Sequence, residues 1–338
     1  MHFSTLAGAS LLASAAMAYP HNMKRTSTGQ TVVYWGQNYA GAPENNDLST
    51  YCDGTSGIDI IVLAFLNDYG TDGETIPYGT IGQNCQVSSS GTATDCDDLA
   101  AAITTCQDAG ITVLLSLGGS SGSYTVTSQS EGETIGQYLW DAYASPNATS
   151  SSSTTRPFGD AYVNGWDFDI EANPGEDNSN YQYLISTLRS NFDSDPDNTY
   201  YITGAPQCPI PEPNMQSMIE NSKFDYLWIQ FYNNPGCSTN SGTNYGDWIS
   251  NIANTSSADA KLFIGVPAGE LAANGQTSGE VYYLEPSELA TIVANYSSEA
   301  AFGGIMLWDA GFSDNNVNDG CTYAQEASSI LSTGSPCS

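Results

Sequence analysis

The sequence predicts a single-domain (β/α)8 (TIM) barrel of the α/β class, held by four disulfides. Eight short apolar blocks alternate with stretches of helical pattern, and no Pro-rich or long Ser/Thr linker divides the chain. Several blocks also end on polar or aromatic residues, as strands do when their carboxyl ends form an active site. Alternation of this kind within one domain favours a parallel barrel. The predicted strands are Thr31–Trp35, Asp59–Phe65, Ile111–Leu117, Tyr162–Glu171, Thr199–Ala205, Tyr226–Tyr232, Leu262–Val266 and Gly303–Trp308.

The amino-terminal segment predicts secretion. Residues 1–18 combine a short apolar stretch with an Ala-x-Ala cleavage site, which is typical of a signal peptide, and the stretch is too short to span a membrane. Lys24-Arg25 has the form of a dibasic processing site, so residues 19–25 are predicted to be a propeptide and the barrel domain to cover 26–338. We therefore expect a secreted, extracellular protein, with cell-wall association left open.

The charge and the histidine content exclude several function classes. Both histidines, His2 and His21, precede residue 26, so the mature chain has no imidazole for Ser-His-Asp catalysis, Cys-His catalysis or metal binding. The formal net charge is −31, whereas nucleic acids and anionic membranes attract basic surfaces. A neutral polar substrate is compatible with this field. No metal or organic cofactor is implied, and we expect a monomer.

Eight cysteines in a secreted chain predict four disulfides, and the absence of a Cys-x-x-Cys spacing argues against zinc and redox motifs. Nesting of near neighbours favours one pairing but does not prove it: Cys85–Cys96, Cys208–Cys237, Cys321–Cys337 and, by remainder, Cys52–Cys106. Three Asn-x-Ser/Thr sequons add candidate glycosylation sites at Asn147, Asn254 and Asn295.

The most informative segment is Asn164–Glu171, which reads Asn-Gly-Trp-Asp-Phe-Asp-Ile-Glu. Successive side chains of a β-strand alternate faces, so the large apolar residues point one way and the acids the other. The acids on one face are Asp167, Asp169 and Glu171. Carboxyl groups about 6–7 Å apart on one face repel one another, and together with burial this raises at least one pKa. The arrangement indicates acid catalysis, with Glu171 nearest the mouth of the barrel.

These residues resemble glycoside hydrolase family 18, specifically its hevamine-like (class III) chitinases, whose signature reads Asp-x-x-Asp-x-Asp-x-Glu. Further segments resemble the same family, in order from the first predicted strand to the eighth: Tyr34–Asn38, Ala64–Asn67, Ser116–Gly119, Ala205–Pro209, Gln230–Asn234 and Met306–Trp308. The resemblance covers nearly the whole mature chain. It implies a secreted, endo-acting chitinase that hydrolyses β-1,4-linked N-acetylglucosamine polymers or oligosaccharides with retention, through substrate-assisted (oxazolinium) catalysis.

The resemblance also implies roles for single residues. Glu171 would be the general acid and then the general base. Asp169 would orient the substrate acetamide, and Asp167 would share a proton with Asp169. Tyr232 would donate its hydroxyl to the acetamide oxygen, and Trp308 would form an apolar floor under the sugar ring. The other expected substrate contacts are Gln230, Gln37, Asn233 and Gly119.

One position departs from the signature, because Asn164 stands where the family usually has Asp. The resemblance gives this position a structural or remote electrostatic role deep in the strand, so we expect altered pKa coupling but retained activity. The cysteine pattern also resembles that of the family. It implies the pairs 52–106, 85–96 and 208–237, with 321–337 as an addition.

Other interpretations stay open. A lectin or an enzyme inhibitor of the same fold would keep the barrel without catalysis, although loss of the acid at Glu171 would be expected in such a protein. An endo-β-N-acetylglucosaminidase acting on glycoprotein glycans would share the mechanism. Among single residues, Trp308 could belong to the core, Tyr232 could bond the backbone, and Gly118-Gly119 could form a tight turn.

Overall fold

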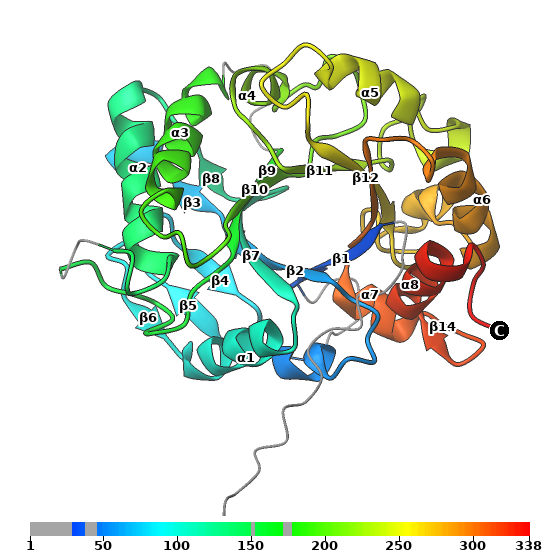
Figure 1. The fold of residues 1–338 in the computed structure, drawn as a ribbon, viewed down its shortest axis with the longest axis horizontal. Helices are drawn as coiled ribbons and strands as arrows, with labels where there is room; N and C mark the ends of the chain where they lie inside the picture. The colour runs from blue at the N-terminus through cyan, green and yellow to red at the C-terminus, as the bar shows by residue number, and fades with distance from the viewer. Residues whose placement is uncertain (1–28, 38–45, 150–152, 172–177) are drawn as a thin grey trace, which may run out of the picture.

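The chain forms a closed barrel of eight parallel strands surrounded by helices in the computed structural model (Figure 1). The structure describes residues 29–37, 46–149, 153–171 and 178–338. The strand order is β1-β13-β12-β11-β10-β9-β7-β2, and the pairing of β1 with both β2 and β13 closes the ring. The predicted (β/α)8 class is therefore confirmed.

All eight predicted strands are present, with shifted ends. A barrel strand is covered by helices on one side and packed by side chains on the other, which explains why every residue of Ile60–Leu66 is buried. The fourth strand is shorter than predicted and begins at Gly165, because the preceding Val163 N–H donates to Tyr143 O at a helix end. The barrel strands are β1 Gln30–Trp35, β2 Ile60–Leu66, β7 Thr112–Gly119, β9 Gly165–Ile170, β10 Tyr201–Gly204, β11 Tyr226–Gln230, β12 Lys261–Pro267 and β13 Phe302–Trp308.

The helices cover the outside of the barrel, and some of them begin with a capping side chain. Ser128 accepts the Glu131 N–H at the start of α2, and Thr322 forms a capping box with Gln325 at the start of α8. Gly334 ends α8 in the left-handed conformation. The helices are α1 Asp97–Asp108, α2 Gln129–Tyr143, α3 Tyr181–Phe192, α4 Gln216–Asn221, α5 Tyr245–Ile252, α6 Pro286–Tyr296, α7 Ala310–Asn315 and α8 Tyr323–Thr333. Short 3-10 turns occupy Leu48–Cys52, Thr71–Gly73, Asn178–Asn180, Thr239–Ser241 and Thr277–Tyr282.

The barrel wall separates two hydrophobic cores. The larger lies between strands and helices and includes the outward side chains of β9, which are Trp166, Phe168 and Ile170. The smaller lies inside the barrel and includes Val32, Val62, Leu114, Trp228 and Phe263. The inward face of β9 carries the buried acids Asp167 and Asp169 instead. The predicted alternation on this strand is therefore confirmed.

Three short polar side chains tie neighbouring strands together at their amino ends. Asp59, Asn164 and Asp225 stand directly before β2, β9 and β11. Each side chain accepts the backbone N–H of the second residue of a neighbouring strand, at 2.8, 3.0 and 2.8 Å: Thr31, Val113 and Ile202. Each clamp residue also donates its own N–H to the carbonyl of that residue. We call these pairs the register clamps; they give a partner to backbone groups at the end of the sheet.

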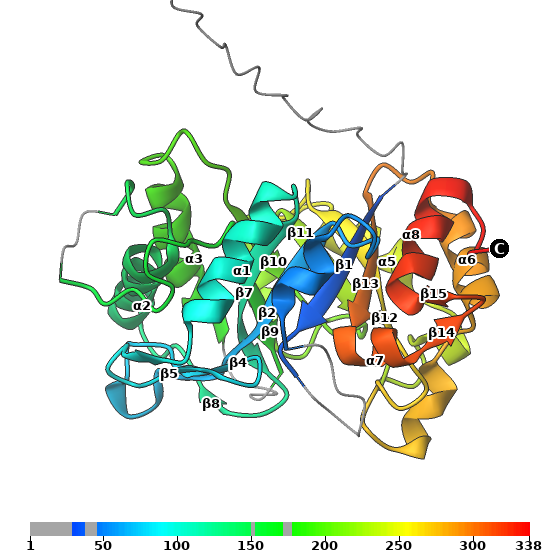
Figure 2. The ribbon, with the colours of Figure 1, turned by 90° about the horizontal axis from the view of Figure 1, so that it is seen from below.

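The opposite end of the barrel is built up by insertions on one side (Figure 2). Between β2 and α1 lies an antiparallel sheet of β4 Gly79–Ile81, β5 Cys85–Val87 and β6 Ala93–Thr94. A second small pair joins β3 Asp68–Tyr69 to β8 Ser123–Tyr124. The hairpin of β14 Val317–Asn318 and β15 Cys321–Thr322 precedes α8.

The four disulfides join Cys52 to Cys106, Cys85 to Cys96, Cys208 to Cys237 and Cys321 to Cys337. These are the pairs that nesting favoured. The sequon asparagines are all exposed: Asn147, Asn254 and Asn295. The predicted signal peptide and propeptide lie outside the described residues. Across the described ranges, no helix combines the length and apolarity needed to cross a membrane.

Candidate active site

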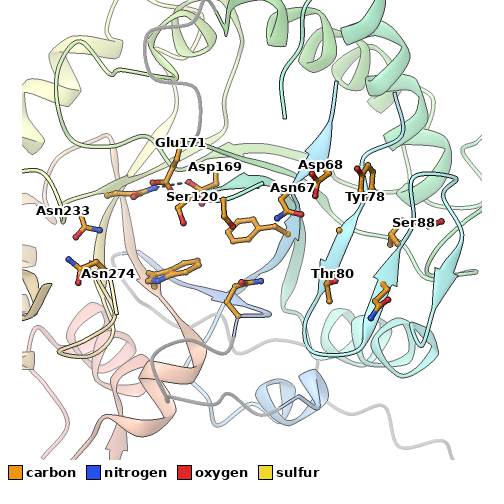
Figure 3. Close-up of a pocket in the computed structure, with 18 of the residues that line it drawn as sticks. Asn67, Asp68, Tyr78, Thr80, Ser88, Ser120, Asp169, Glu171, Asn233 and Asn274 are labelled. Carbon is orange, nitrogen blue, oxygen red and sulfur yellow. Dashed lines mark hydrogen bonds between the residues drawn. The ribbon is translucent and has the colours of Figure 1, made fainter. Parts of the chain in front are cut away.

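A cleft of about 920 Å³ opens at the carboxyl ends of the barrel strands (Figure 3). Asp169 and Glu171 lie in its wall, with Asn274 toward one end and Thr80 and Ser88 toward the other. Barrel enzymes place their catalytic groups at this end. Within the described ranges, no group of three or more His, Cys, Asp or Glu side chains is arranged to hold a metal ion.

Asp167 is fully buried and does not line the cleft. Its two oxygens accept four hydrogen bonds of 2.6 to 2.9 Å from side chains of four other strands: Tyr34, Ser116, Thr203 and Trp228. Burial raises the pKa of Asp167, whereas the four donors counteract this by favouring its carboxylate. All four donors are uncharged side chains, and the sharing of a proton between Asp167 and Asp169 stays a prediction.

Asp169 and Glu171 form the acid pair of the cleft. Asp169 Oδ1 accepts from Gln230 Nε2 at 3.0 Å, and the carboxyl groups of Asp169 and Glu171 influence each other's pKa. Burial, followed by the charges of Glu171 and Asp167, raises the pKa of Asp169 well above its usual range. Burial also raises the pKa of Glu171, although hydrogen bonds from Asp169, Gln207 and Gln230 counteract this. Burial therefore favours a protonated form of the Asp169–Glu171 pair, and the two carboxyl groups titrate together.

Glu171 is held at both its backbone and its carboxyl group. Its N–H donates to Tyr124 Oη at 2.9 Å, and Tyr124 Oη donates to Gly119 O at 2.5 Å, which ties the end of β9 to the end of β7. Its Oε2 accepts from Gln207 Nε2 at 3.1 Å. Since Gln207 follows β10, connections to two neighbouring strands determine where the Glu171 carboxyl group lies.

Aromatic side chains complete the site around the acid pair. Trp308 lines the cleft at the end of β13 and packs on Phe65, with ring centroids 6.0 Å apart. The Ala64–Phe65 and Trp308–Asp309 peptide bonds are both cis. Tyr232 lines the cleft at 6% exposure, and burial followed by the charges of Glu171 and Asp169 raises its pKa well above the usual range. Its hydroxyl therefore stays protonated and able to donate.

Two of the expected substrate amides also line the cleft. Gln37 Nε2 lies 3.1 Å from Gly36 O, and Asn233 Nδ2 donates to Ala273 O at 2.5 Å. Both amides are therefore oriented by backbone carbonyls. Gln230 lines the same cleft.

Gly118 and Gly119 end β7 with φ of 106° and 95°. A Cβ at Gly118 would lie 2.2 Å from Asp169 O, so glycine allows β7 to approach the acidic strand. Gly119 is not a lining residue, in contrast to the expectation; Ser120 and Ser121 line the cleft instead. Both glycines belong to the strand and do not form a tight turn.

Asn164 is not part of the acid row. It stands three residues before Asp167 and so faces the other side of the strand, where its Oδ1 accepts from Gln107 Nε2 at 2.9 Å as well as from Val113 N. These contacts give Asn164 a structural role, and its effect on the pKa coupling of the acids stays a prediction. The position is a register clamp, and Asn supplies the same kind of oxygen acceptor as Asp225 does.

A second group of cleft residues is not predicted from the sequence. These side chains line the part of the cleft between β2 and the β4–β6 sheet: Asn67, Asp68, Tyr78, Thr80, Gln86, Ser88, Thr92 and Thr94. Asn67 stands directly after β2, so its position at a strand end was a usable signal. The sheet residues give no such signal, because their approach to the cleft depends on how a long loop folds.

Comparison with known proteins gives one family. The family model described as glycosyl hydrolases family 18 matches residues 30–281. Endochitinase 2 of Metarhizium anisopliae is 57% identical over 316 residues, which cover 91% of this chain and 74% of that protein. The endochitinase of Saccharomyces cerevisiae is 37% identical over 92% of this chain and 52% of that protein.

Solved structures share the fold. The ICChI chitinase from Ipomoea carnea is 30% identical with a TM-score of 0.66, over 88% of this chain and 97% of that one. The xylanase and α-amylase inhibitor protein XAIP-II from Scadoxus multiflorus is 29% identical with a TM-score of 0.68, over 91% and 99%. Because the family model matches most of the described barrel and the Metarhizium relative is similar over most of both chains, this chain belongs to glycosyl hydrolase family 18.

Proposed function

We propose that the protein is an endochitinase that cleaves β-1,4 linkages between N-acetylglucosamine units and retains the configuration of the anomeric carbon. The observation that carries the proposal is the acid pair of Asp169 and Glu171 in the wall of a cleft that Trp308 also lines. Relatives named endochitinases support the substrate class, at up to 57% identity. The described lining contains no Lys or Arg, which suits an uncharged sugar chain.

The positions of the acids favour substrate-assisted catalysis. Asp169 and Glu171 lie two residues apart on one strand face, so they cannot act from opposite faces of a sugar as acid and separate nucleophile. Glu171 protonates the glycosidic oxygen while the 2-acetamido oxygen of the substrate attacks C1, which breaks the C1–O bond and forms an oxazolinium ion. Glu171 then deprotonates a water that attacks C1 and restores the acetamide with net retention.

The neighbouring groups prepare this reaction. When the shared proton lies on Glu171, the Asp169 carboxylate accepts the acetamide N–H and stabilises the positive charge of the oxazolinium ion. Tyr232 donates to the acetamide oxygen and so holds it near C1. Trp308 supports the apolar face of the ring.

The acid pair also predicts the pH dependence. Glu171 needs a proton to act as general acid, and burial raises its pKa above the ordinary value. Activity therefore extends to higher pH than an ordinary glutamic acid would allow, and it falls as pH rises through the apparent pKa of the Asp169–Glu171 pair.

The test is release of reducing ends from N-acetylglucosamine oligomers by wild type and Glu171→Gln, from pH 3 to 8. Loss of the acid should lower the rate by about 10²–10⁴-fold. NMR of the first product tests retention, because a retaining enzyme releases the β-anomer first. A fall in viscosity of a soluble chitin derivative ahead of reducing-end release tests endo action.

A binding protein is the second candidate, because solved inhibitors share the fold at similar identity to the plant chitinase. Oligomer binding by wild type without cleavage would indicate a lectin. Inhibition of a xylanase or an α-amylase without chitin cleavage would indicate an inhibitor. Release of glycans from glycoproteins, with chitin oligomers left intact, would indicate an endo-β-N-acetylglucosaminidase.

The protein is proposed to act outside the cell as a monomer, without nucleic-acid, membrane or cofactor partners. Four disulfides support an extracellular environment, and a net charge of −31 argues against nucleic-acid and anionic-membrane partners. Mass spectrometry of the secreted protein tests it: we expect a mature chain that begins near Thr26 and glycans on Asn147, Asn254 or Asn295. Sedimentation gives the oligomeric state, and cell fractionation tests attachment to a wall.

A further inference from the structure

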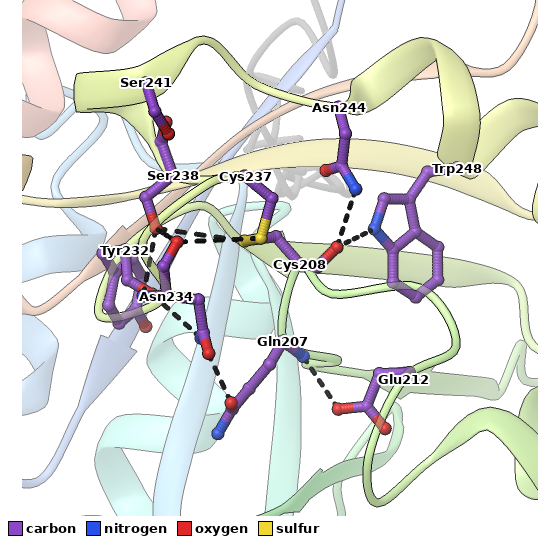
Figure 4. The surroundings of a disulfide bond; sticks show 10 residues. All are labelled: Gln207, Cys208, Glu212, Tyr232, Asn234, Cys237, Ser238, Ser241, Asn244 and Trp248. Carbon is purple, nitrogen blue, oxygen red and sulfur yellow. Dashed lines mark hydrogen bonds between the residues drawn. A yellow bond between two sulfur atoms is a disulfide. The ribbon is translucent and has the colours of Figure 1, made fainter.

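We infer that Gln207 is a positioning residue for the general acid, and that Asn234 fixes the direction in which the Gln207 amide points. This inference rests on the proposed function, in which Glu171 is that acid. Neither Gln207 nor Asn234 lines the cleft. They connect Glu171 to the loops that follow β10 and β11, beside the Cys208–Cys237 disulfide (Figure 4).

Three side chains form one line of hydrogen bonds. Glu171 Oε2 accepts from Gln207 Nε2 at 3.1 Å, and Gln207 Oε1 accepts from Asn234 Nδ2 at 3.1 Å. Asn234 Nδ2 also lies 3.3 Å from Tyr232 O. The Asn234 amide nitrogen therefore donates to two oxygens at once, and this sets the orientation of its side chain.

The line has a direction, because a carboxamide has one donor end and one acceptor end. Asn234 presents a donor, so the end of Gln207 that meets it must be Oε1. The Gln207 NH2 group must then face Glu171, where it favours the carboxylate over the carboxylic acid. A rotation of the Gln207 amide by 180° would place its nitrogen against the nitrogen of Asn234 and its oxygen against Glu171.

The backbone on the Gln207 side is anchored independently. Gln207 N–H donates to Glu212 Oε1 at 3.1 Å, and Glu212 is buried. The adjacent Cys208 carbonyl accepts from Trp248 Nε1 at 3.0 Å and from Asn244 Nδ2 at 2.9 Å. The loop after β10 is thereby held against α5, so little movement of Gln207 is available.

The Asn234 side is anchored as well. Asn234 N–H donates to Ser238 Oγ at 3.1 Å, and Ser238 Oγ donates to Asn234 O at 2.7 Å. The Cys208–Cys237 disulfide joins the two loops with a Cα–Cα distance of 5.8 Å. The two amides are therefore held at a fixed separation, and their contact is built into the structure.

The titratable groups that face Glu171 in the described part of the chain come from four elements. They are Asp169 on its own strand, Tyr124 of β8, Glu212 after β10 and Tyr232 after β11. Gln207 is uncharged, so its replacement by an uncharged side chain leaves the charges of this set in place. A change in the titration of the Asp169–Glu171 pair then reports the lost hydrogen bond.

The experiment compares the pH dependence of kcat/KM for wild type, Gln207→Met and Asn234→Asp on N-acetylglucosamine oligomers. Met is close to Gln in size but donates nothing, so the basic limb should move about one unit to higher pH, as expected for loss of one hydrogen bond to a charged group. Asn234→Asp presents an acceptor to Gln207 and reverses its amide. The limb should move in the same direction, although residue 234 does not touch Glu171.

The double variant distinguishes an effect transmitted through the Gln207 amide from a direct effect of the new charge at position 234. If Asn234→Asp acts through Gln207, its shift disappears when Gln207→Met is already present. An equal shift in both backgrounds would be a charge effect and would overturn the role of Asn234. Asn244→Leu is the control: it perturbs the same loop at Cys208 O without contacting Gln207 or Glu171, and its limb should stay in place.

The outcomes distinguish the two proposals. An inactive wild type would refute the proposed function. An active wild type, lost activity in Glu171→Gln and an unmoved limb in Gln207→Met would leave the function standing and overturn the inference. Thermal unfolding of each variant checks folding, and the position of the limb does not depend on the fraction of folded enzyme. A mere loss of packing lowers kcat/KM at every pH and leaves the limb where it is.

Discussion

Gln230 Nε2 lies 3.0 Å from Asp169 Oδ1 and also donates to Ala205 O at 3.0 Å, so one amide group ties the middle acid of the row to the end of β10. Asp169 is thereby fixed between a neutral donor and the carboxyl group of Glu171. Crowding of this kind raises the pKa of Asp169 and opposes folding, which means that the site gives up stability for reactivity.

Asp169→Asn should separate these two effects. The new amide keeps an oxygen for Gln230 and a donor for Glu171, but it removes the titrating group. We expect the rate on oligomers to fall by about 10²-fold or more, while the free energy of unfolding at pH 7 rises by about 1 kcal/mol because a buried acid beside two others is gone. Kinetics and urea unfolding measure both quantities. Full activity in this variant would contradict the role of Asp169.

Asp167→Ala should cost far more stability than Asp169→Ala. The first change leaves four buried donors without their acceptor, whereas the second removes the acceptor of Gln230. Each buried unpaired donor costs about 1–3 kcal/mol, so a difference of several kcal/mol between the two variants is expected. Urea unfolding gives the comparison, and equal losses would show that Asp167 is not the structural centre of the barrel interior.

Asn164→Asp should be neutral, because the clamp needs only an oxygen acceptor. We expect the free energy of unfolding to change by less than about 0.5 kcal/mol and the pH profile of activity to stay in place. Asn164→Leu is the contrasting variant. It removes the acceptor of the Val113 N–H and should lower the free energy of unfolding by about 1–3 kcal/mol. A moved pH limb in Asn164→Asp would instead support an electrostatic role for this position.

Stability should fall as pH rises from about 5 to 8. Burial raises the pKa of Glu212 to about 7 and that of Asp309 to about 7. The folded chain therefore binds more protons than the unfolded chain between the ordinary carboxyl range and about pH 7. The contribution of these two protonated groups to the free energy of unfolding is complete below the ordinary carboxyl range, and it is lost as pH rises through about 7.

A Tm higher by roughly 5 °C at pH 5 than at pH 8 is the expected size of this effect. Calorimetry measures it. Glu212→Gln removes one of the two titrations and should flatten the profile, whereas Asp247→Asn at an exposed position of α5 serves as the control. A profile that rises with pH would contradict the raised pKa values.

The strands and the acid row were predictable because both depend on local pattern. Parallel strands buried on two faces give apolar runs, and alternation along β9 places Asp167 and Asp169 on the side opposite Trp166 and Phe168. The same parity argument shows that Asn164, an odd number of residues before Asp167, faces away from the acids. That inference was available from the sequence alone.

The cleft wall beyond β2 and the Gln207–Asn234 contact were not predictable in this way. Thr80 and Gln86 reach the cleft only because an inserted sheet folds back over the barrel end. Gln207 meets Asn234 across two loops whose separation is set by a disulfide and by packing on α5. Such contacts follow from tertiary structure, and no spacing in the sequence contains them.

The register clamps lie at the amino ends of the strands, and the cleft lies at their carboxyl ends. A slip of β9 by one residue would turn its aromatic side chains into the barrel and its acids outward. By accepting the Val113 N–H, Asn164 fixes the register of β9 against β7, and this register determines which side chains of β9 face the cleft. The loops around the cleft can lengthen or shorten during evolution without changing the register, because the clamps lie at the other end of the barrel.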